Sequence, residues 1–258
     1  VAYGLLLALA WVRLRGIDVA LTEAALGTGL TGAMLIAAAT RLRGTEDRAR
    51  QEGPGAAIRV LAGLLATGVT VALAIAVLSL PDPAPTLAPA TAENIQPIGV
   101  GNPITAVLLA FRAMDTLLEA IVVLFALIGV WSLAPDALWG GRPGPRHRVD
   151  PDGILAYMAR ILPPIGIIVG TYIFWIGADL PGGKFQGATL LAAMWLLMVM
   201  AGLVDTPPTA KTWLRVVLVA GPVIFIGVGA FGAVVAGVFL GYPDGLAKPL
   251  IKLIEWAL

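Results

Sequence analysis

Apolar stretches of membrane-spanning length recur along this chain and constrain its fold more than any other feature. A bilayer core of about 30 Å takes about 20 apolar residues in a helix, and backbone groups in lipid must bond within the segment. Such stretches cover residues 18–40, 57–80, 104–134, 155–177, 186–204 and 214–240. We therefore predict an all-α fold, a polytopic transmembrane helix bundle.

Two shorter apolar stretches flank these six, at residues 1–12 and 246–258. Each is shorter than the roughly 20 residues that cross a bilayer, so each reads as part of a helix. Counting them gives about seven or eight membrane spans. Because the first residue is Val1 and no basic region precedes the apolar run, we expect a chain truncated at both ends.

The composition excludes several classes of protein. Hydrophobic residues make up 59% of the chain and charged residues 13%, with a mean hydropathy of +0.90, whereas soluble domains have about 25% charged residues. A net charge of +1 gives no basic surface for nucleic acid. There is no cysteine, and the single histidine, His147, lies in a loop rich in Arg, Pro and Gly. We expect no metal site and no cofactor.

The charge of the loops predicts an orientation. Arginine is concentrated in the loops 41–59, 135–153 and 205–215, which alternate with loops poorer in Lys and Arg, and 81–103 has neither. By the positive-inside rule the Arg-rich loops face the cytoplasm. The pattern is typical of a multi-pass protein of the cell's inner (plasma) membrane.

Two loops divide the chain. The stretch 81–103 is rich in Pro, Ala and Thr, which favours an extended linker over a packed core of its own. The stretch 135–153 contains repeated Pro and Gly, which break helices. We therefore predict three segments, 1–80, 81–134 and 154–258.

Three charged residues interrupt the apolar span 104–134. Arg112, Asp115 and Glu119 fall within an arc of roughly 60° on one face of a continuous helix. A charge at the centre of a membrane helix costs about 2.5 to 3.5 kcal/mol, so such residues need pairing, water or a place inside a bundle. Two carboxylates balanced by a guanidinium suit a proton relay. The alternative is a structural salt bridge between neighbouring helices.

A second candidate is Glu23, which lies about 10 Å into the first complete apolar span by helical rise. Asp18, earlier in the same span, is explained as a helix cap or an interfacial charge. Glu23 cannot be explained in that way. An intramembrane carboxylate of this kind is protonated, paired across helices or in contact with water, so we predict a place for it in an ion path.

The third candidate is a glycine-rich stretch, Gly177 to Gly187, between two apolar spans. Its proline and glycines predict a tight hairpin turn whose exposed amides can hold an anion or a carboxylate. The order of Lys, Gly and Ser/Thr is wrong for a phosphate-binding loop.

Three motifs resemble parts of one family, the Mrp-type sodium/proton antiporters. Gly177-x-x-x-Pro-Gly-Gly-x-Phe-x-Gly187 resembles the signature turn of the MnhB- or MrpB-like subunit and of its counterpart in membrane-bound hydrogenases. Asp18-Val-Ala-Leu-Thr22-Glu23 resembles the MbhD-like part in the C-terminal tail of the MrpA-like subunit. Phe111-Arg112-x-x-Asp115-Thr116-Leu-x-Glu119 resembles the MbhE-like part that follows it. The order is that of an MrpA-like tail fused to an MrpB-like subunit.

The resemblance implies an accessory membrane subunit of a hetero-oligomeric complex that exchanges Na⁺ for H⁺. It implies Glu23 as an acceptor of a proton or Na⁺, and Asp115 and Glu119 as relay carboxylates whose charge Arg112 balances. Thr22 and Thr116 are possible supporting oxygen ligands, with Asp18 nearby. The turn departs from the family in two places: Ala178 and Asp179 precede the proline where the family has His or Asn, and Lys184 replaces Gly.

Other functions stay open on the sequence. The same scaffold serves in redox-driven complexes such as membrane-bound hydrogenases, with cofactors in other subunits, or acts as a spacer between ion-translocating subunits. A free-standing solute transporter is disfavoured because the segments show no internal repeat. A hydrolytic enzyme is disfavoured because a nucleophile, histidine and acid set is missing.

Overall fold

The computed structural model describes residues 2–42, 53, 55–81, 83, 85–135, 139–143 and 153–258, and it is helical without strands over that part of the chain. His147 and most of the Arg-rich loop at 41–59 lie outside the described residues. The helices are α1 (Ala2–Arg13), α2 (Ile17–Thr22), η1 (Glu23–Leu30), α3 (Thr31–Leu42), α5 (Ala56–Leu78), α6 (Ala88–Asn94), η3 (Gln96–Ile98), α7 (Pro103–Ala106), η4 (Val107–Phe111), α8 (Ala113–Ser132), α9 (Ile154–Ile176), α10 (Lys184–Met200), α11 (Thr212–Val235) and α12 (Ala247–Ala257).

Helices long and apolar enough to cross a membrane confirm the predicted class, a multi-pass membrane protein. Among the described residues there are 5 of them, at Ile17–Ile36, Ala56–Leu78, Ala113–Ser132, Ile154–Ile176 and Thr212–Val235. Ala2–Arg13 and Lys184–Met200 are shorter apolar helices. The predicted stretch 246–258 contains α12, whose 11 residues extend about 16 Å.

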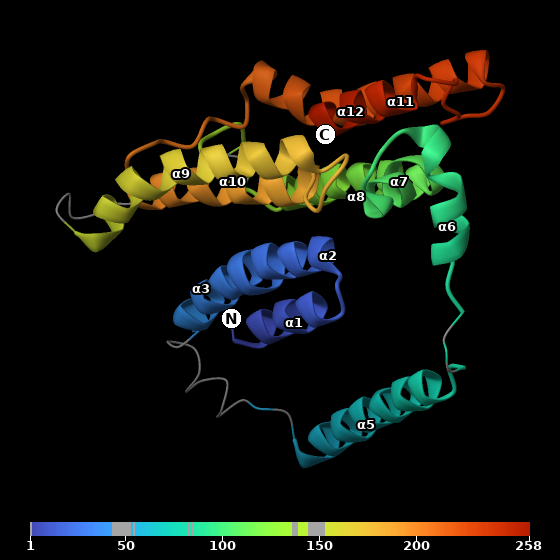
Figure 1. Ribbon diagram of the computed structural model, residues 1–258. Helices are drawn as coiled ribbons and strands as arrows, with labels where there is room; N and C mark the ends of the chain where they lie inside the picture. Colours follow the sequence, from blue (N-terminus) through green and yellow to red (C-terminus); the bar gives the residue numbers. More distant parts are fainter. Residues whose placement is uncertain are drawn as a thin grey trace.

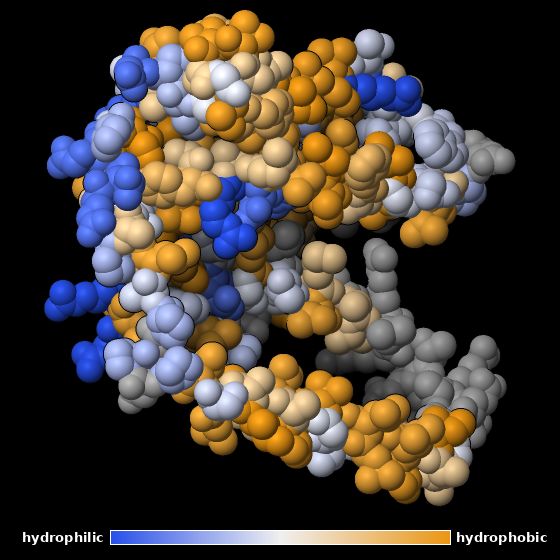
Figure 2. All heavy atoms as spheres, turned by 90° about the vertical axis from the view of Figure 1, so that its right-hand side faces the viewer, coloured by the Kyte–Doolittle hydropathy of each residue, from blue (hydrophilic) through white to orange (hydrophobic). Residues whose placement is uncertain are grey.

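The helices pack in groups that follow the order of the chain (Figure 1). The hairpin of α9 and α10 lies beside α8 and α7, with α11 and α12 along one side of it. The first helix, α1, packs against the continuous helix formed by α2, η1 and α3. No residue of α5 is buried, and Figure 2 shows this helix covered by apolar side chains along the bottom of the molecule.

The hydrophobic core is formed by α8, α11, α12 and the segment before α8. Its buried members are Val100, Ala106, Leu109, Ala113, Leu117, Ala178, Phe225, Val228, Leu240, Ile251 and Ile254. The stretch 81–103 is thus more than the extended linker we predicted. It forms α6 and η3, and its last residues enter the core because Ile95, Ile98 and Val100 supply apolar side chains that its average composition conceals.

The span 104–134, predicted as one helix, is broken at Arg112. The backbone there leaves the helical region, with φ −129° and ψ 35°, between the π-helical turn η4 and α8. A break inside lipid leaves carbonyls that need new donors. Two side chains supply them: the Thr116 hydroxyl donates to the Leu108 carbonyl at 2.6 Å, and the Tyr242 hydroxyl donates to the Leu109 carbonyl at 2.5 Å.

We expect Thr116→Val to destabilise the protein. Valine has nearly the shape of threonine but no hydroxyl, so the Leu108 carbonyl loses a donor at a buried position. The free energy of unfolding should fall by about 1–3 kcal/mol, measured by denaturant titration of the detergent-solubilised protein. The matched control is Thr70→Val, because the Thr70 hydroxyl bonds within the exposed helix α5. An equal effect of the two changes would contradict the role given to Thr116.

Candidate functional site

The turn between α9 and α10 is as tight as its glycines predict. A Cβ added at Gly177 would lie 2.2 Å from the Gly183 Cα, and one at Gly182 would lie 2.5 Å from the Ile173 carbonyl oxygen. Gly182 and Gly183 have φ values of 147° and 133°, which L-residues with side chains rarely adopt. The turn closes through the Gly183 amide, which donates to the Ile173 carbonyl at 3.0 Å.

The turn binds a carboxylate, and that carboxylate belongs to the chain itself. Asp18 Oδ1 accepts a hydrogen bond from the Gly182 amide at 2.9 Å and from Asn102 Nδ2 at 3.2 Å. Our prediction of Asp18 as a helix cap was wrong: the residue before α2 is Gly16, and no side chain caps the helix there. The residue Asp18 is only 8% exposed, and its carboxylate joins α2 to Asn102 and to the turn between α9 and α10.

Asn102 is the centre of this junction. Its Oδ1 caps α7 by accepting from the Ile104 amide at 2.9 Å. Its Nδ2 also lies 3.1 Å from the Gly177 carbonyl and 3.0 Å from the Leu180 carbonyl. Together with its bond to Asp18, one buried side chain therefore joins all three predicted segments of the chain.

A second, more exposed link ties α12 to the same turn. Lys248 Nζ lies 2.6 Å from Asp179 Oδ1, which also accepts from the Gly101 amide at 3.2 Å. The hydrogen bond from Lys248 holds the pKa of Asp179 below its ordinary value. Asp179, which departs from the family pattern, is therefore a fixed acceptor that keeps the start of α12 beside the turn.

A cavity of about 380 Å³ lies next to the junction. Polar side chains from several helices line it: Asp18, Thr22, Thr105, Thr116, Glu119, Lys184, Gln186 and Glu255. Thr22 and Gln186 are joined directly, since Gln186 Nε2 donates to Thr22 Oγ1 at 3.1 Å. In a chain with so few charges, this gathers acidic groups from three helices, α2, α8 and α12, around a single lysine.

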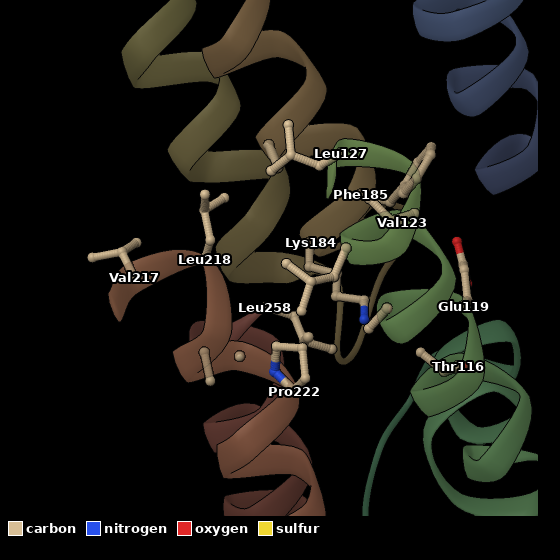
Figure 3. Close-up of a pocket in the computed structure, with 15 residues that line it drawn as sticks. Thr116, Glu119, Val123, Leu127, Lys184, Phe185, Val217, Leu218, Pro222 and Leu258 are labelled. Carbon is tan, nitrogen blue, oxygen red and sulfur yellow. The ribbon is translucent and has the colours of Figure 1, made fainter. Parts of the chain in front are cut away.

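A neighbouring pocket of about 460 Å³ shares Thr116, Glu119 and Lys184 with this cavity but is otherwise almost wholly apolar. Figure 3 shows Lys184 among the apolar side chains of this pocket, across from the turn of α8 that carries Thr116 and Glu119. The lysine therefore lies on the wall that the two cavities share.

The three charged residues of the span 104–134 form one ion pair and one separate carboxylate. Arg112 and Asp115 form an ion pair at 2.5 Å, with 68% and 54% of their side chains exposed. Glu119 is apart from that pair and lines the cavity. Asp115 and Glu119 both lie within α8, so the break at Arg112 leaves their i, i+4 spacing intact.

Glu23 begins the π-helix η1 and is partly buried. Its carboxyl group folds back along its own helix toward Gly27, where an added Cβ would lie 2.1 Å from Glu23 Oε1. Glu23 does not line the cavity, although the preceding residue, Thr22, does. Among the described residues, none forms an ion pair with it.

Sequence reasoning missed Asn102, Lys184 and Glu255 as site residues. Asn102-Pro103 before an apolar run is a signal for a helix start, which could have identified the cap. Lys184 was visible only as a departure from the family pattern. Glu255 lies in the apolar stretch 246–258, and nothing in the sequence brings it near residues of α8 and α10.

Burial raises the pKa of Glu255. This residue lies on the short helix α12, is only 6% exposed, and desolvation raises its pKa from 4.5 to about 7. The positive charges of Lys184 and Lys252 act in the opposite direction but are weaker than the desolvation. Glu255 is therefore a carboxyl group that gains and loses a proton near neutral pH.

The helices and the buried junction define a multi-pass α-helical membrane protein with a polar cavity beside the point where its segments meet. Residues 154–257 match a family model described as a domain related to the MnhB subunit of Na⁺/H⁺ antiporters, and residues 1–44 match the MbhD model, described as the D subunit of MBH. One polypeptide thus joins a region that matches the MbhD model and a region that matches the MnhB-related model, which supports a subunit of the Mrp type. This confirms the resemblance drawn from two of the three motifs.

A solved structure shares the fold. It is the structure of the Mrp complex from Dietzia sp. DQ12-45-1b, which matches 98% of this chain with a TM-score of 0.65 and 24% identity. The match covers 30% of the chain in that structure. No curated protein matches the sequence.

We expect Asn102→Ala to destabilise the protein more than any exposed polar substitution. The change removes the cap of α7 and the bonds to Asp18, Gly177 and Leu180, leaving buried groups without partners. The free energy of unfolding should fall by about 2–4 kcal/mol in denaturant titrations. Asn94→Ala is the control, because Asn94 is exposed and bonds only one turn back along α6. Similar losses for the two variants would argue against the junction.

The raised pKa of Glu255 predicts how stability depends on pH. The folded protein holds the proton more tightly than the unfolded chain does, so this contribution is complete below pH 4.5 and is lost as the pH rises toward about 7. The loss is on the order of 3 kcal/mol. Glu255→Gln should abolish it, whereas Glu93→Gln, at an exposed position, should not. Melting temperatures of the three proteins between pH 4 and 8 would check this, and parallel curves would contradict it.

Proposed function

We propose that the chain is an accessory membrane subunit of a multi-subunit cation/proton antiporter, and that it contributes ionisable groups to the path of Na⁺ or H⁺. The family of the chain supports the antiporter assignment. The observation that carries the proposed role is the cavity that places Asp18, Glu119 and Glu255 around Lys184.

The free-energy cost of placing ionisable groups inside a membrane protein supports a function in transport. Each ionisable side chain inside a membrane protein costs several kcal/mol unless it is paired or hydrated. Asp18 is satisfied by two amide donors. Glu119, Lys184 and Glu255 share the cavity, but no ion pair joins them among the described residues. Groups that are not held in permanent pairs are suited to exchanging a proton or a cation.

The other predicted site residues have different roles in this proposal. Glu119, an exposed residue on the wall of the cavity, is the relay carboxylate. Arg112 and Asp115 form a balanced pair on the surface of this chain, where another subunit can cover them. Glu23 directly follows Thr22 but points along its own helix toward Gly27, so it stays outside the cavity that Thr22 lines.

The partners of the chain follow from the same proposal. They are other subunits of a hetero-oligomeric antiporter in the inner membrane, together with Na⁺, H⁺ and lipid. The exposed apolar surface supports this, since α5 is apolar and unburied along its whole length. Such a helix needs lipid or other membrane helices around it.

The second candidate is a place in the membrane arm of a redox-driven ion pump such as a membrane-bound hydrogenase. The observation that favours it is the match of residues 1–44 to the MbhD model. Identifying the proteins that copurify with the chain separates the two functions, because hydrogenase subunits would support the pump and antiporter subunits alone would support exchange.

We expect Glu119→Gln to lower cation-driven proton movement at least tenfold in the assembled complex. The amide cannot take up a proton, so the relay loses its member on α8. The measurement is the collapse of a pH gradient in proteoliposomes on adding Na⁺, followed with a pH-sensitive dye. Glu93→Gln, on the exposed face of α6, is the control and should behave like the wild type. Full exchange by a correctly assembled Glu119→Gln complex would contradict the relay and support the alternative, a chain that acts only as a spacer between other subunits.

A further inference from the structure

Lys184 is the one lysine on the cavity wall among the described residues, and it opens α10 directly after the glycine turn. The MnhB-like pattern has glycine at this position, so the lysine adds a charge that the tight turn does not require. Its side chain is partly buried. A lysine in such a place needs acidic neighbours or water to remain charged.

The acidic neighbours are Glu119 on α8 and Glu255 on α12. Their charges are the two that favour the ammonium form of Lys184. All three residues line the same cavity, yet neither carboxylate lies within ion-pair distance of Lys184 among the described residues. The space between them is therefore part of the cavity, where water can connect the groups.

The position of Glu255 is fixed by its neighbours on α12. Trp256 packs edge-on against Phe174 of α9, with ring centroids 4.8 Å apart, and Ile251 and Ile254 are fully buried in the core. One turn earlier on the same helix, Lys252 Nζ lies 5.5 Å from the ring centroid of Trp175. Glu255 is thus held against the turn, with Oε1 3.9 Å from the place of a Cβ on Gly183.

The other charged groups around Glu255 have their own partners. Asp18 lines the same cavity, but its carboxylate accepts from the amides of Gly182 and Asn102. Lys252 lies on the tryptophan ring, and Lys248 is paired with Asp179. This leaves Lys184, Glu119 and Glu255 as the ionisable groups of the cavity without a fixed hydrogen-bond partner among the described residues.

We propose that Lys184 is a proton-transfer residue that connects Glu255 to Glu119 through the water of this cavity. This inference rests on the proposed antiporter function and deepens it. The Lys184 ammonium gives one proton to the Glu119 carboxylate and becomes a neutral amine. The amine then takes a proton from the Glu255 carboxyl, which becomes a carboxylate. One proton has moved from α12 to α8, and the total charge of the three groups is unchanged.

The arrangement suits such a transfer for two physical reasons. Burial brings Glu255 to a pKa of about 7, so its carboxyl can give and regain a proton at physiological pH. The guanidinium of an arginine at position 184 would supply the same positive charge but would not release a proton. Lysine and arginine therefore differ at this position if the proton moves, and are equivalent if only the charge matters.

The test compares Lys184→Arg, Lys184→Met and, as a control at an exposed position away from the cavity, Lys211→Met in the assembled complex. Proteoliposomes are loaded at a fixed pH gradient, and Na⁺-driven proton movement is followed from pH 6 to 9. We expect both Lys184 variants to lose at least tenfold in rate, and the Lys211 variant to stay within twofold of the wild type. Assembly is checked by gel filtration, and Lys184→Arg decides the outcome where Lys184→Met does not assemble.

Wild-type rates and an unchanged pH profile in an assembled Lys184→Arg complex would overturn the proposal, because the charge alone would then be sufficient. Glu255→Gln provides a second measurement: it should remove the change in rate around pH 7, and a retained change would also overturn the proposal. A wild-type complex that moves no protons in response to Na⁺ would refute the antiporter function instead. The failures of the two proposals are thus distinguishable.

Discussion

The need to satisfy backbone polar groups where helices end or break determines much of this structure. Inside a membrane protein, a free amide or carbonyl costs several kcal/mol, so each turn has to find partners in the rest of the chain. The glycine turn after α9 finds them in Asp18 and Asn102, and the break at Arg112 finds them in Thr116 and Tyr242. These bonds connect residues that are up to 164 positions apart.

The polar cavity is a consequence of those same bonds. Because Asp18 is held at the turn, α2 lies beside the start of α10, which brings Thr22 next to Gln186. Glu119, one turn beyond Asp115 on α8, lines the cavity, whereas Asp115 is paired with Arg112. The link between Asp179 and Lys248 then keeps α12 in place and Glu255 with it. The stabilising contacts and the proposed transfer site therefore share their residues.

Much of the fold was readable from the sequence. Long apolar runs predicted the positions of the main helices, because a backbone in lipid has few alternatives to a helix. The glycines of the turn predicted a hairpin that binds a carboxylate, since only residues without a side chain permit such close approach. The family resemblance rested on these motifs. By contrast, the helix break at Arg112 was not predicted, because no proline or glycine lies near it in the sequence.

The sequence by itself determined the class of the protein, the main spans, the tight turn and the presence of costly charges among apolar residues. Those properties depend on the local order of residues, through helical periodicity and the size of side chains. Only the tertiary structure decided which charges meet. Asp18 and Gly182 come from different segments of the chain, and Lys184, Glu119 and Glu255 come from three different helices. Such pairings depend on how helices pack, and that is set by many weak contacts that no short motif contains.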